Sequence, residues 1–390
     1  MGRAPFRTTR LDHKAMGDPN VPGMDFALVM KDRLLVLSRY SRLGASSRLR
    51  TMQYKPWLED AGFDVEYAAL FDDDYLKKLY SGQKSKTDLL RYYRQRISRL
   101  RQRPKPKLAW IEKETLPWLP WIAEQAFLPK SVPIVSDYDD ALFHRYDLHK
   151  LPPVRWFLGR KIDQVMQHSQ LVTAGNTYLA DRARHARAGH VEIVPTVVDL
   201  AQYTVRSERP MTPSAHVGWI GTPNTWHAFG KNLYDQLNDT LVVHGARFKA
   251  VGAQLEAQSS GALDIAPWSE VTEVSAIQSM DIGVMPLTDT PWARGKCGYK
   301  LIQYMACGLP VIASPVGVNK DIVEHGLNGF LAETDEEWRS AVETLLSDAE
   351  LRRRMGAAGR KKVEESYSLQ VWGPRVAQML RRVADEGRKA

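Results

Sequence analysis

The sequence predicts an α/β protein with two facing Rossmann-like β/α/β domains and a cleft between them. Three observations support this fold class. The chain has 390 residues, which is too long for one ordinary hydrophobic core. From Asp32 onward, short apolar runs alternate with amphipathic stretches, as in parallel sheets covered on both faces. A Pro- and Ser-containing segment, residues 206–215, interrupts the alternation, which then resumes.

The pattern divides the chain into four parts. We expect a loosely ordered extension at 1–30, a first domain at 31–208, a second domain at 209–368 and a final helix at 369–390. The extension is basic but contains no apolar segment, so it does not predict a secretory signal.

Each expected strand is a short apolar run. In the first domain we expect strands in RLLVLS (33–38), FDVEYAAL (63–70), KLAWIE (107–112), VPIVSDYD (132–139) and SQLVTAGN (169–176). In the second domain we expect them in HVGWIG, TLVVHGA, LDIAPW, MDIGVMPL and LPVIASP. The segment GASSRLRTMQYKPWLEDAG predicts a loop and a helix ending at Gly62, and a short helix is expected from Tyr299 to Cys307.

Composition and cysteine usage indicate a reduced, cytoplasmic protein. Hydrophobic residues make up 44% and charged residues 25% of the chain, as in soluble globular proteins. No apolar run approaches the ~18 residues needed to span a bilayer. The only cysteines are Cys297 and Cys307. On a helix they would lie ~15 Å apart, whereas a disulfide needs Cα atoms within ~7 Å.

The net charge of +9 indicates an acidic partner, and the basic residues gather in one segment. Residues 84–107 contain ten Lys or Arg and one acid, Asp88. Apolar residues recur there at three- and four-residue spacing: Leu89, Leu90, Tyr93, Ile97 and Leu100. This pattern predicts a basic amphipathic helix for an anionic membrane surface or a partner. The alternative is a core-packed helix with a solvated basic face. Nucleic acid is not expected, because no recognition module accompanies the segment.

Ligands of such sheets bind where strands lead into helices, and four loops there carry candidate residues. In the first loop, SRLGASSRLR, Gly44 permits close backbone approach, Ser46 or Ser47 can cap a helix, and Arg48 can reach an anion. The alternative is a capped helix with a surface arginine.

The second loop, GWIGTPNTWH, can cradle a phosphate through backbone N–H groups and hydroxyls. Its candidate residues are Gly221, Thr222, Asn224 and Thr225. An N-capped helix explains the same residues equally well.

The third loop follows the strand in VPIVSDYD and places Asp137, Asp139 and Asp140 close together. Carboxylates this close repel one another, so water, a metal ion or hydrogen-bond donors must offset their repulsion. Acid/base work, metal binding and helix capping all remain open.

The fourth loop, GKCGYKLIQ, opens a helix, whose unpaired N–H groups and dipole favour an anion. Gly298 and Tyr299 supply main-chain N–H groups, Lys296 and Lys300 add charge, and Gln303 can bond a hydroxyl of the same ligand. The alternative is a helix cap with two solvated lysines.

These residues carry a resemblance to a known family. The stretch DIGVMPL…GKCGYKLIQYMACGLPVIASPVGVNKDIVEHGLNGFLA resembles the C-terminal half of family 4 glycosyltransferases, which have the GT-B fold. The segments LVTAGNTYLADRA and VEIVPTVVDLAQY are similar to the end of that family's first domain and its interdomain crossing. The resemblance covers roughly residues 33–380 and is strongest from 170 to 335.

The resemblance implies a retaining, hexosyltransferase-type enzyme that uses a nucleoside-diphosphate sugar and needs no bound metal or cofactor. The second domain would bind the donor, the first would face the acceptor, and the final helix would cross back to the first domain. Donor-binding positions would be Gly221, Thr222, Asn224, Thr225, Lys296, Cys297, Gly298, Tyr299, Lys300 and Gln303. Asp139 stands where many relatives carry a histidine near the reacting sugar, and Asp140 where they carry an aspartate. The loop with Gly44, Ser46, Ser47 and Arg48 would close over the phosphates or meet the acceptor.

The sequence departs from the family at two positions. Relatives have two glutamates eight positions apart, contacting the sugar and the ribose, where this chain has Gly295 and Gln303. Gln303 can still bond a ribose hydroxyl, but Gly295 offers no side chain, and we expect Lys296 to compensate as a phosphate ligand.

The expected reaction is sugar transfer to an acceptor hydroxyl, with the donors and cations of these loops taking up the charge of the leaving diphosphate. The acceptor is expected to be a lipid-linked or cell-surface glycan, as in polysaccharide biosynthesis, near the inner face of a membrane. Alternatives are a nucleotide-sugar epimerase of the same fold and a metal-dependent glycosyltransferase that uses Asp-x-Asp. A two-domain ligand-binding protein is a further alternative.

Overall fold

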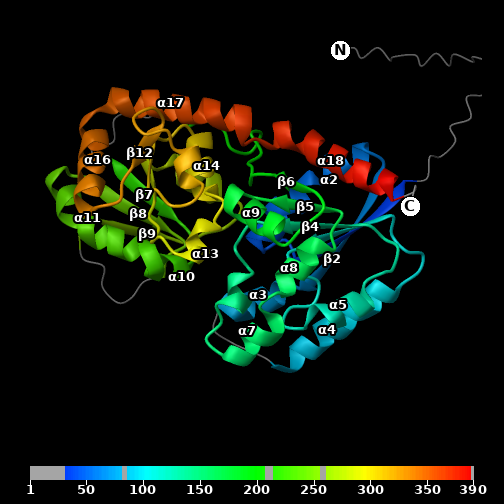
Figure 1. Cartoon of the computed structure of the whole chain (residues 1–390). Coiled ribbons are helices and arrows are strands. Elements are labelled where there is room, and N and C mark those ends of the chain that lie inside the picture. Colours follow the sequence, from blue (N-terminus) through cyan, green and yellow to red (C-terminus); the bar gives the residue numbers. More distant parts are fainter. Residues whose placement is uncertain (1–30, 81–85, 207–213, 255–260, 388–390) are drawn as a thin grey trace, which may run out of the picture. The chain divides into compact units, whose positions relative to one another are not determined.

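The computed structural model describes residues 31–80, 86–206, 214–254 and 261–387, and those from Asp32 on belong to one compact unit (Figure 1). The predicted extension at 1–30 and most of the predicted linker at 206–215 lie outside the described residues.

The first half of this unit is built on a parallel sheet of six strands in the order β2-β1-β3-β4-β5-β6. The strands are β1 (Asp32–Tyr40), β2 (Phe63–Phe71), β3 (Leu108–Glu112), β4 (Ile134–Tyr138), β5 (Leu171–Ala174) and β6 (Val191–Ile193). The central strands are apolar because helices cover both faces of such a sheet. All five residues of β3 are buried, for example.

Helices connect these strands. They are α1 (Ala45–Arg50), the 3₁₀-helix η1 (Met52–Tyr54), α2 (Lys55–Asp60), α3 (Asp73–Tyr80), α4 (Lys86–Arg101), α5 (Trp121–Phe127), α6 (His144–Asp147), α7 (Pro152–Leu158), α8 (Lys161–Gln167) and α9 (Thr177–His185).

The second half repeats the architecture with strand order β12-β11-β10-β7-β8-β9. Its strands are β7 (His216–Ile220), β8 (Arg247–Val251), β9 (Leu263–Ala266), β10 (Ile282–Met285), β11 (Val311–Ala313) and β12 (Gly329–Leu331). Its helices are α10 (Pro223–Thr225), the π-helix η2 (Trp226–Gly230), α11 (Lys231–Val243), α12 (Glu273–Gln278), α13 (Pro291–Arg294), α14 (Tyr299–Ala306), α15 (Asn319–Ile322), α16 (Asp335–Ser347) and α17 (Ala349–Ser366). Two parallel sheets covered by helices confirm the predicted fold class.

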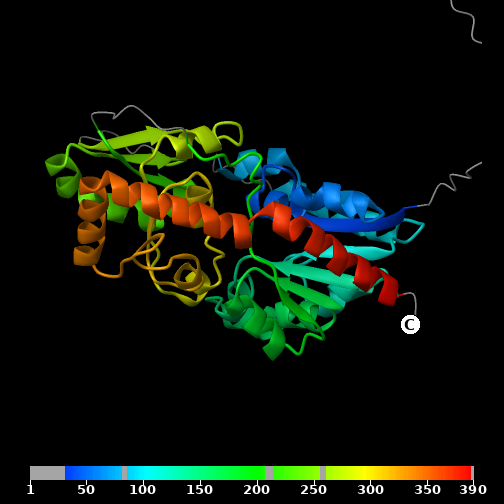
Figure 2. The ribbon, with the colours of Figure 1, turned by 90° about the horizontal axis from the view of Figure 1, so that it is seen from above.

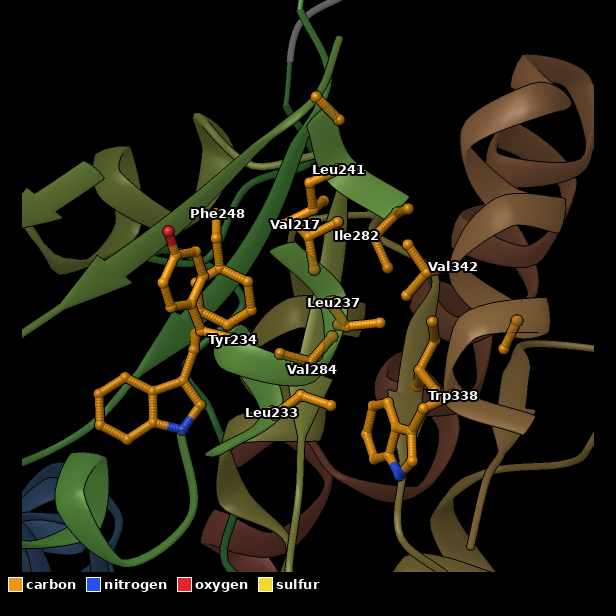
Figure 3. Close-up of a cluster of buried hydrophobic side chains, with 14 of the residues drawn as sticks. Val217, Leu233, Tyr234, Leu237, Leu241, Phe248, Ile282, Val284, Trp338 and Val342 are labelled. Atoms are coloured by element: carbon orange, nitrogen blue, oxygen red, sulfur yellow. The ribbon is translucent and has the colours of Figure 1, made fainter. Parts of the chain in front are cut away.

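The strand predicted in TLVVHGA is wrong, because this segment is the last turn of α11 and the start of a loop. Leu233, Leu237 and Leu241 recur every four residues and pack into the core beside Phe248 (Figure 3). Val242 and Val243 are 59% and 82% exposed, so the apolar run is not a buried strand. The next strand, β8, begins at Arg247. Strands β6, β8 and β12 were not predicted.

The final helix, α18 (Leu369–Glu386), packs against the first sheet. Its buried residues Leu369, Val376 and Leu380 join a core cluster with Leu34 and Trp110. Figure 2 shows α17 in orange leading into α18 in red, which runs along the strands of the first half.

Helix α4 exists as predicted, but its buried face is different from the predicted one. Of the predicted apolar stripe, Leu90 is 66% exposed, whereas Leu100 is buried. Tyr92 and Arg96 are also buried, and Arg96 donates to the carbonyl of Ser38 at 2.6 Å. A basic residue is therefore part of the packed face.

None of the helices in the described part of the chain combines the length and the apolar content needed to cross a membrane.

Candidate active site

Loops from the two halves meet where strands β1, β3 and β4 end and helix α14 begins. The ammonium of Lys296, just before α14, lies 3.4 Å from Oδ1 of Asp140, just after β4. The thiol of Cys297 donates to the carbonyl of Asp139 at 3.1 Å. This is the edge at which parallel sheets bind ligands. The structure therefore brings the predicted third and fourth loops together.

Asp139 is held by a lysine that the sequence analysis did not single out. The ammonium of Lys113, directly after β3, lies 2.7 Å from Oδ1 of Asp139. Burial alone would raise the pKa of Asp139, but Lys113 and the guanidinium of Arg50 lower it to about 2. Lys113 has a positive φ of 66°, a strained conformation for a residue with a side chain. Asp139 is therefore a fixed negative charge at any working pH.

Asp137, the first carboxylate of the third loop, has a structural role. It forms a buried bidentate ion pair with Arg50, at 2.9 and 2.7 Å, and accepts a hydrogen bond from Thr173 at 2.6 Å. Its oxygens are thus occupied by protein donors, which disfavours the Asp-x-Asp metal alternative. Within the described ranges, no three His, Cys, Asp or Glu residues are grouped so that they could hold a metal ion.

The start of α14 has the backbone geometry of an anion site. Gly298 precedes the helix with φ of +65°, and a Cβ there would lie 2.3 Å from Cδ1 of Ile322. Only glycine fits this position, which turns the chain into the helix. The first N–H groups of any α-helix lack acceptors within the helix, so those of Tyr299 and Lys300 are available to a ligand.

Two lysines add charge to this helix start. Lys300 lies over the ring of Trp219, with Nζ 4.4 Å from the ring centroid, and it forms no hydrogen bond or ion pair with any described residue. Burial and the nearby ammonium of Lys296 lower the pKa of Lys300 to about 7. An anion that binds beside a lysine without a counter-ion stabilises the charged ammonium, and this stabilisation is larger than for a lysine that is already paired.

Gln303 is buried one turn into α14 and belongs to a hydrogen-bond network. Its amide donates to the hydroxyl of Tyr203 at 2.7 Å, and that hydroxyl bonds the carboxylate of Glu273. The indole of Trp268 donates to the other oxygen of Glu273 at 2.6 Å. A carboxylate therefore lies close to Gln303, although residue 303 is itself neutral.

Glu273 and Tyr203 face a cavity of about 380 Å³. Its wall also includes Tyr299, at the start of α14, and Arg48, from the first predicted loop. Such a cavity is large enough for part of a nucleotide.

In the predicted first loop, some residues stabilise the loop itself and Arg48 contacts the other half. Ser47 is buried and donates to Glu112 at 2.5 Å, so it supports the loop. Ser46 accepts a hydrogen bond from Lys113 at 3.3 Å. Arg48 crosses to the other half, where Nε lies 3.8 Å from Glu270. A Cβ at Gly44 would lie 2.4 Å from Cβ of Tyr40, which explains the glycine.

The predicted second loop is an N-capped helix start. Thr222 and Thr225 form a reciprocal capping box, with Thr225 Oγ1 accepting from Thr222 N at 3.0 Å. Their hydroxyls are thus engaged with each other and the backbone. Asn224 is exposed and forms no hydrogen bond with the described residues. A Cβ at Gly221 would lie 2.5 Å from the ring of Trp219.

Gly295 cannot carry a side chain in this arrangement. A Cβ there would lie 2.5 Å from Cβ and 2.7 Å from the backbone N of Ala141, a residue of the other half. We therefore expect Gly295→Glu, the residue of the relatives, to reduce activity rather than improve it. The clash should also lower the free energy of unfolding by about 1–3 kcal/mol. Differential scanning calorimetry and initial rates measure the two effects.

The control for this substitution is Gly189→Ala, since a Cβ at Gly189 meets no atom within 4 Å. If Gly295→Glu unfolded at the wild-type temperature with higher activity, the contact with Ala141 would not be important.

Lys113, Arg50, Tyr203 and Glu273 were missed by the sequence analysis. Lys113 stands in IEKE at the end of a buried strand, and that position could have identified it. The other three lie on a helix or in crossing segments, and only tertiary packing brings them to the site.

Comparisons with known proteins bear on the family and the fold. Residues 221–348 match the family model described as glycosyl transferases group 1. A stretch of 72 residues is 38% identical to N-acetyl-alpha-D-glucosaminyl L-malate synthase of Bacillus anthracis, covering 18% of this chain and 19% of that protein. The chain matches less than a quarter of the length of its curated relatives.

Solved structures resemble nearly the whole chain. Sucrose-phosphate synthase from Thermosynechococcus elongatus matches with a TM-score of 0.64 and 14% identity, over 90% of this chain and 99% of its own. Anabaena HepE in complex with UDP-glucose matches with a TM-score of 0.64 and 15% identity, over the same shares. The protein therefore has the GT-B fold, and its residues 221–348 match the group 1 glycosyl transferases.

Proposed function

We propose that the protein transfers a sugar from a nucleoside-diphosphate sugar to an acceptor hydroxyl, with retention of the anomeric configuration. The observation that carries this proposal is the start of α14, where free N–H groups and the unpaired Lys300 lie beside Lys296. The same segment contacts the third loop through Lys296 with Asp140 and through Cys297 with the carbonyl of Asp139. The family match over residues 221–348 and the UDP-glucose complex of HepE support it.

The charges have complementary tasks in this reaction. As the bond to the diphosphate breaks, negative charge grows on the leaving group, and the helix start with Lys300 and Lys296 stabilises it. Positive charge develops on the sugar, and the fixed carboxylate of Asp139 stabilises it from the other half. The leaving phosphate oxygen takes the proton of the acceptor hydroxyl, so no separate base is required. No metal ion is part of this proposal.

The proposal is tested with a panel of nucleotide sugars. We expect one of them to raise the melting temperature, since a ligand that binds only the folded state stabilises it. The same compound should release nucleoside diphosphate in the presence of acceptor, and NMR of the product gives the anomeric configuration. If no compound stabilises the protein or releases diphosphate, the proposal is wrong. Conversion of the donor to an isomer without acceptor would identify an epimerase.

Glu273 is proposed to replace the ribose-binding glutamate that residue 303 lacks. Its carboxylate lines the cavity of about 380 Å³. Each of its oxygens accepts one hydrogen bond, from Tyr203 or Trp268, and can accept a further one from a vicinal diol. We expect Glu273→Gln to weaken binding of the ribonucleotide by about fivefold, because a charged acceptor becomes neutral. Calorimetric titration with the nucleotide and its 2′-deoxy form measures this.

The wild type should prefer the ribonucleotide, and Glu273→Gln should lose most of that preference. Glu270→Gln is the control, since Glu270 contacts Arg42 and Arg48 at the rim. If Glu273→Gln kept the wild-type preference for the ribonucleotide over its 2′-deoxy form, Glu273 would not be the ribose-binding residue.

The acceptor is proposed to be a lipid-linked or cell-surface glycan, handled on the cytoplasmic side of a membrane. The exposed arginines of α4, Arg91, Arg94 and Arg101, support this through their attraction to anionic headgroups.

A further inference from the structure

Large apolar side chains are exposed along the segment from α6 through α7. Leu148, Leu151, Trp156 and Phe157 are 58%, 59%, 78% and 63% exposed. Trp118, 47% exposed, stands beside this segment, with its ring 5.8 Å from that of His149. We name these five apolar residues the aromatic patch. Single exposed apolar residues are ordinary, but a group of this kind marks an interaction surface.

The fold holds the patch outward. Val154 and Leu158, four residues apart on α7, face the core cluster around Tyr146, so Trp156 lies on the opposite side of the helix. Arg155 fixes the preceding turn by donating to the carbonyls of His149 and Lys150, at 2.6 and 3.1 Å. The ring centroids of Trp156 and Phe157 lie 4.2 Å apart. These rings cannot turn inward without breaking the anchors of α7.

The segment that carries the patch is also basic. Residues 144–160 contain four Lys or Arg and one acid, Asp147. Lys161, which follows them, is buried and paired with Glu114 and Glu124. The carboxylate of Asp147 is already engaged by Arg182 at 3.0 Å and by His144 at 2.8 Å. Lys150 and Arg160 are exposed and have no acidic partner among the described residues. The segment from Leu148 to Arg160 therefore exposes both large apolar side chains and unpaired basic side chains.

We propose that the aromatic patch seats the protein on the surface of an anionic lipid bilayer. Trp156 and Phe157 would enter the boundary between headgroups and acyl chains, which aromatic side chains favour. Lys150 and Arg160 would contact the phosphates of the headgroups. Pairing of two copies through this patch is disfavoured, because a two-fold contact would bring the same cations face to face.

This inference does not depend on the proposed sugar transfer, and its test measures binding alone. The full chain is sedimented with vesicles containing phosphatidylglycerol and with vesicles of phosphatidylcholine only. We expect binding to the first to exceed binding to the second and to fall as salt rises. The double variant Trp156→Ser, Phe157→Ser should lose about tenfold in partitioning, since two large apolar groups are removed.

The matched control is Val242→Ser, Val243→Ser, which removes two exposed apolar side chains from α11 in the other half. It should bind vesicles like the wild type. Both double variants should keep the wild-type melting temperature, because the replaced side chains are exposed. A brominated phospholipid should quench part of the tryptophan fluorescence of the wild type. Trp156→Phe should still bind and lose that quenched part.

Three results would overturn the proposal. The first is no binding of the wild type to anionic vesicles, and the second is equal binding of both double variants. The third is a concentration-dependent dimer, seen by light scattering, that Trp156→Ser, Phe157→Ser abolishes.

Discussion

Replacing Asp139 by asparagine is expected to lower turnover by about 100- to 1,000-fold, the usual loss when one preorganised charge is removed from the reacting centre. The pKa of Asp139 is about 2, because Lys113 and Arg50 outweigh the effect of burial. The carboxylate is therefore charged throughout the working pH range, and asparagine removes that charge while keeping the shape. Affinity for the donor should change little, because in the proposed reaction Asp139 contributes mainly when positive charge develops on the sugar.

Steady-state kinetics and titration with the donor separate these two effects. Asp140→Asn is the control, since Asp140 lies on the same loop but pairs with Lys296 at 3.4 Å. It should lose less turnover than Asp139→Asn. Equal losses of turnover and donor affinity in Asp139→Asn would assign this residue to binding. Thermal unfolding must accompany the kinetics, because the substitution removes the carboxylate nearest to the ammonium of Lys113.

Replacing Lys300 by methionine is expected to weaken donor binding by about 10- to 100-fold, the value of a hydrogen bond to a charged group. Wild-type binding should also depend on pH. The pKa of Lys300 in the free protein is about 7, and a bound diphosphate favours the charged form. Below pH 7 the ammonium is already present. Above pH 7 binding must take up a proton, so affinity falls by up to about tenfold per pH unit.

Calorimetric titration from pH 6 to pH 9 with a nucleotide sugar measures this dependence, since a diphosphate esterified at both ends does not titrate in that range. Buffers of different ionisation enthalpy report the proton uptake. Lys300→Arg should bind with little pH dependence, because a guanidinium stays charged. Lys296→Ala should weaken binding only several-fold, since Lys296 already has Asp140 as a partner. A flat pH profile in the wild type would contradict this role of Lys300.

The sequence by itself determined the fold class and indicated which loops carry the candidate residues. Apolar runs such as LAWIE and IGVM can only be buried between helix layers, and they became β3 and β10. Gly298 and the lysines beside it marked a helix start, because these are local chemical features. TLVVHGA was misread because a short apolar run has no periodicity that separates a strand from a helix end.

Tertiary structure alone decided how the charges are paired. Lys113 meets Asp139, and Gln303 reaches Glu273 through Tyr203, across 26 to 100 residues of sequence. Tertiary packing also places Ala141 against Gly295, so that no side chain fits there, and it leaves Trp156 exposed. Pairing and exposure depend on which surfaces the folded chain brings into contact, and no local pattern records them. The sequence therefore specifies which groups are present, and the packing decides which of them remain free to act.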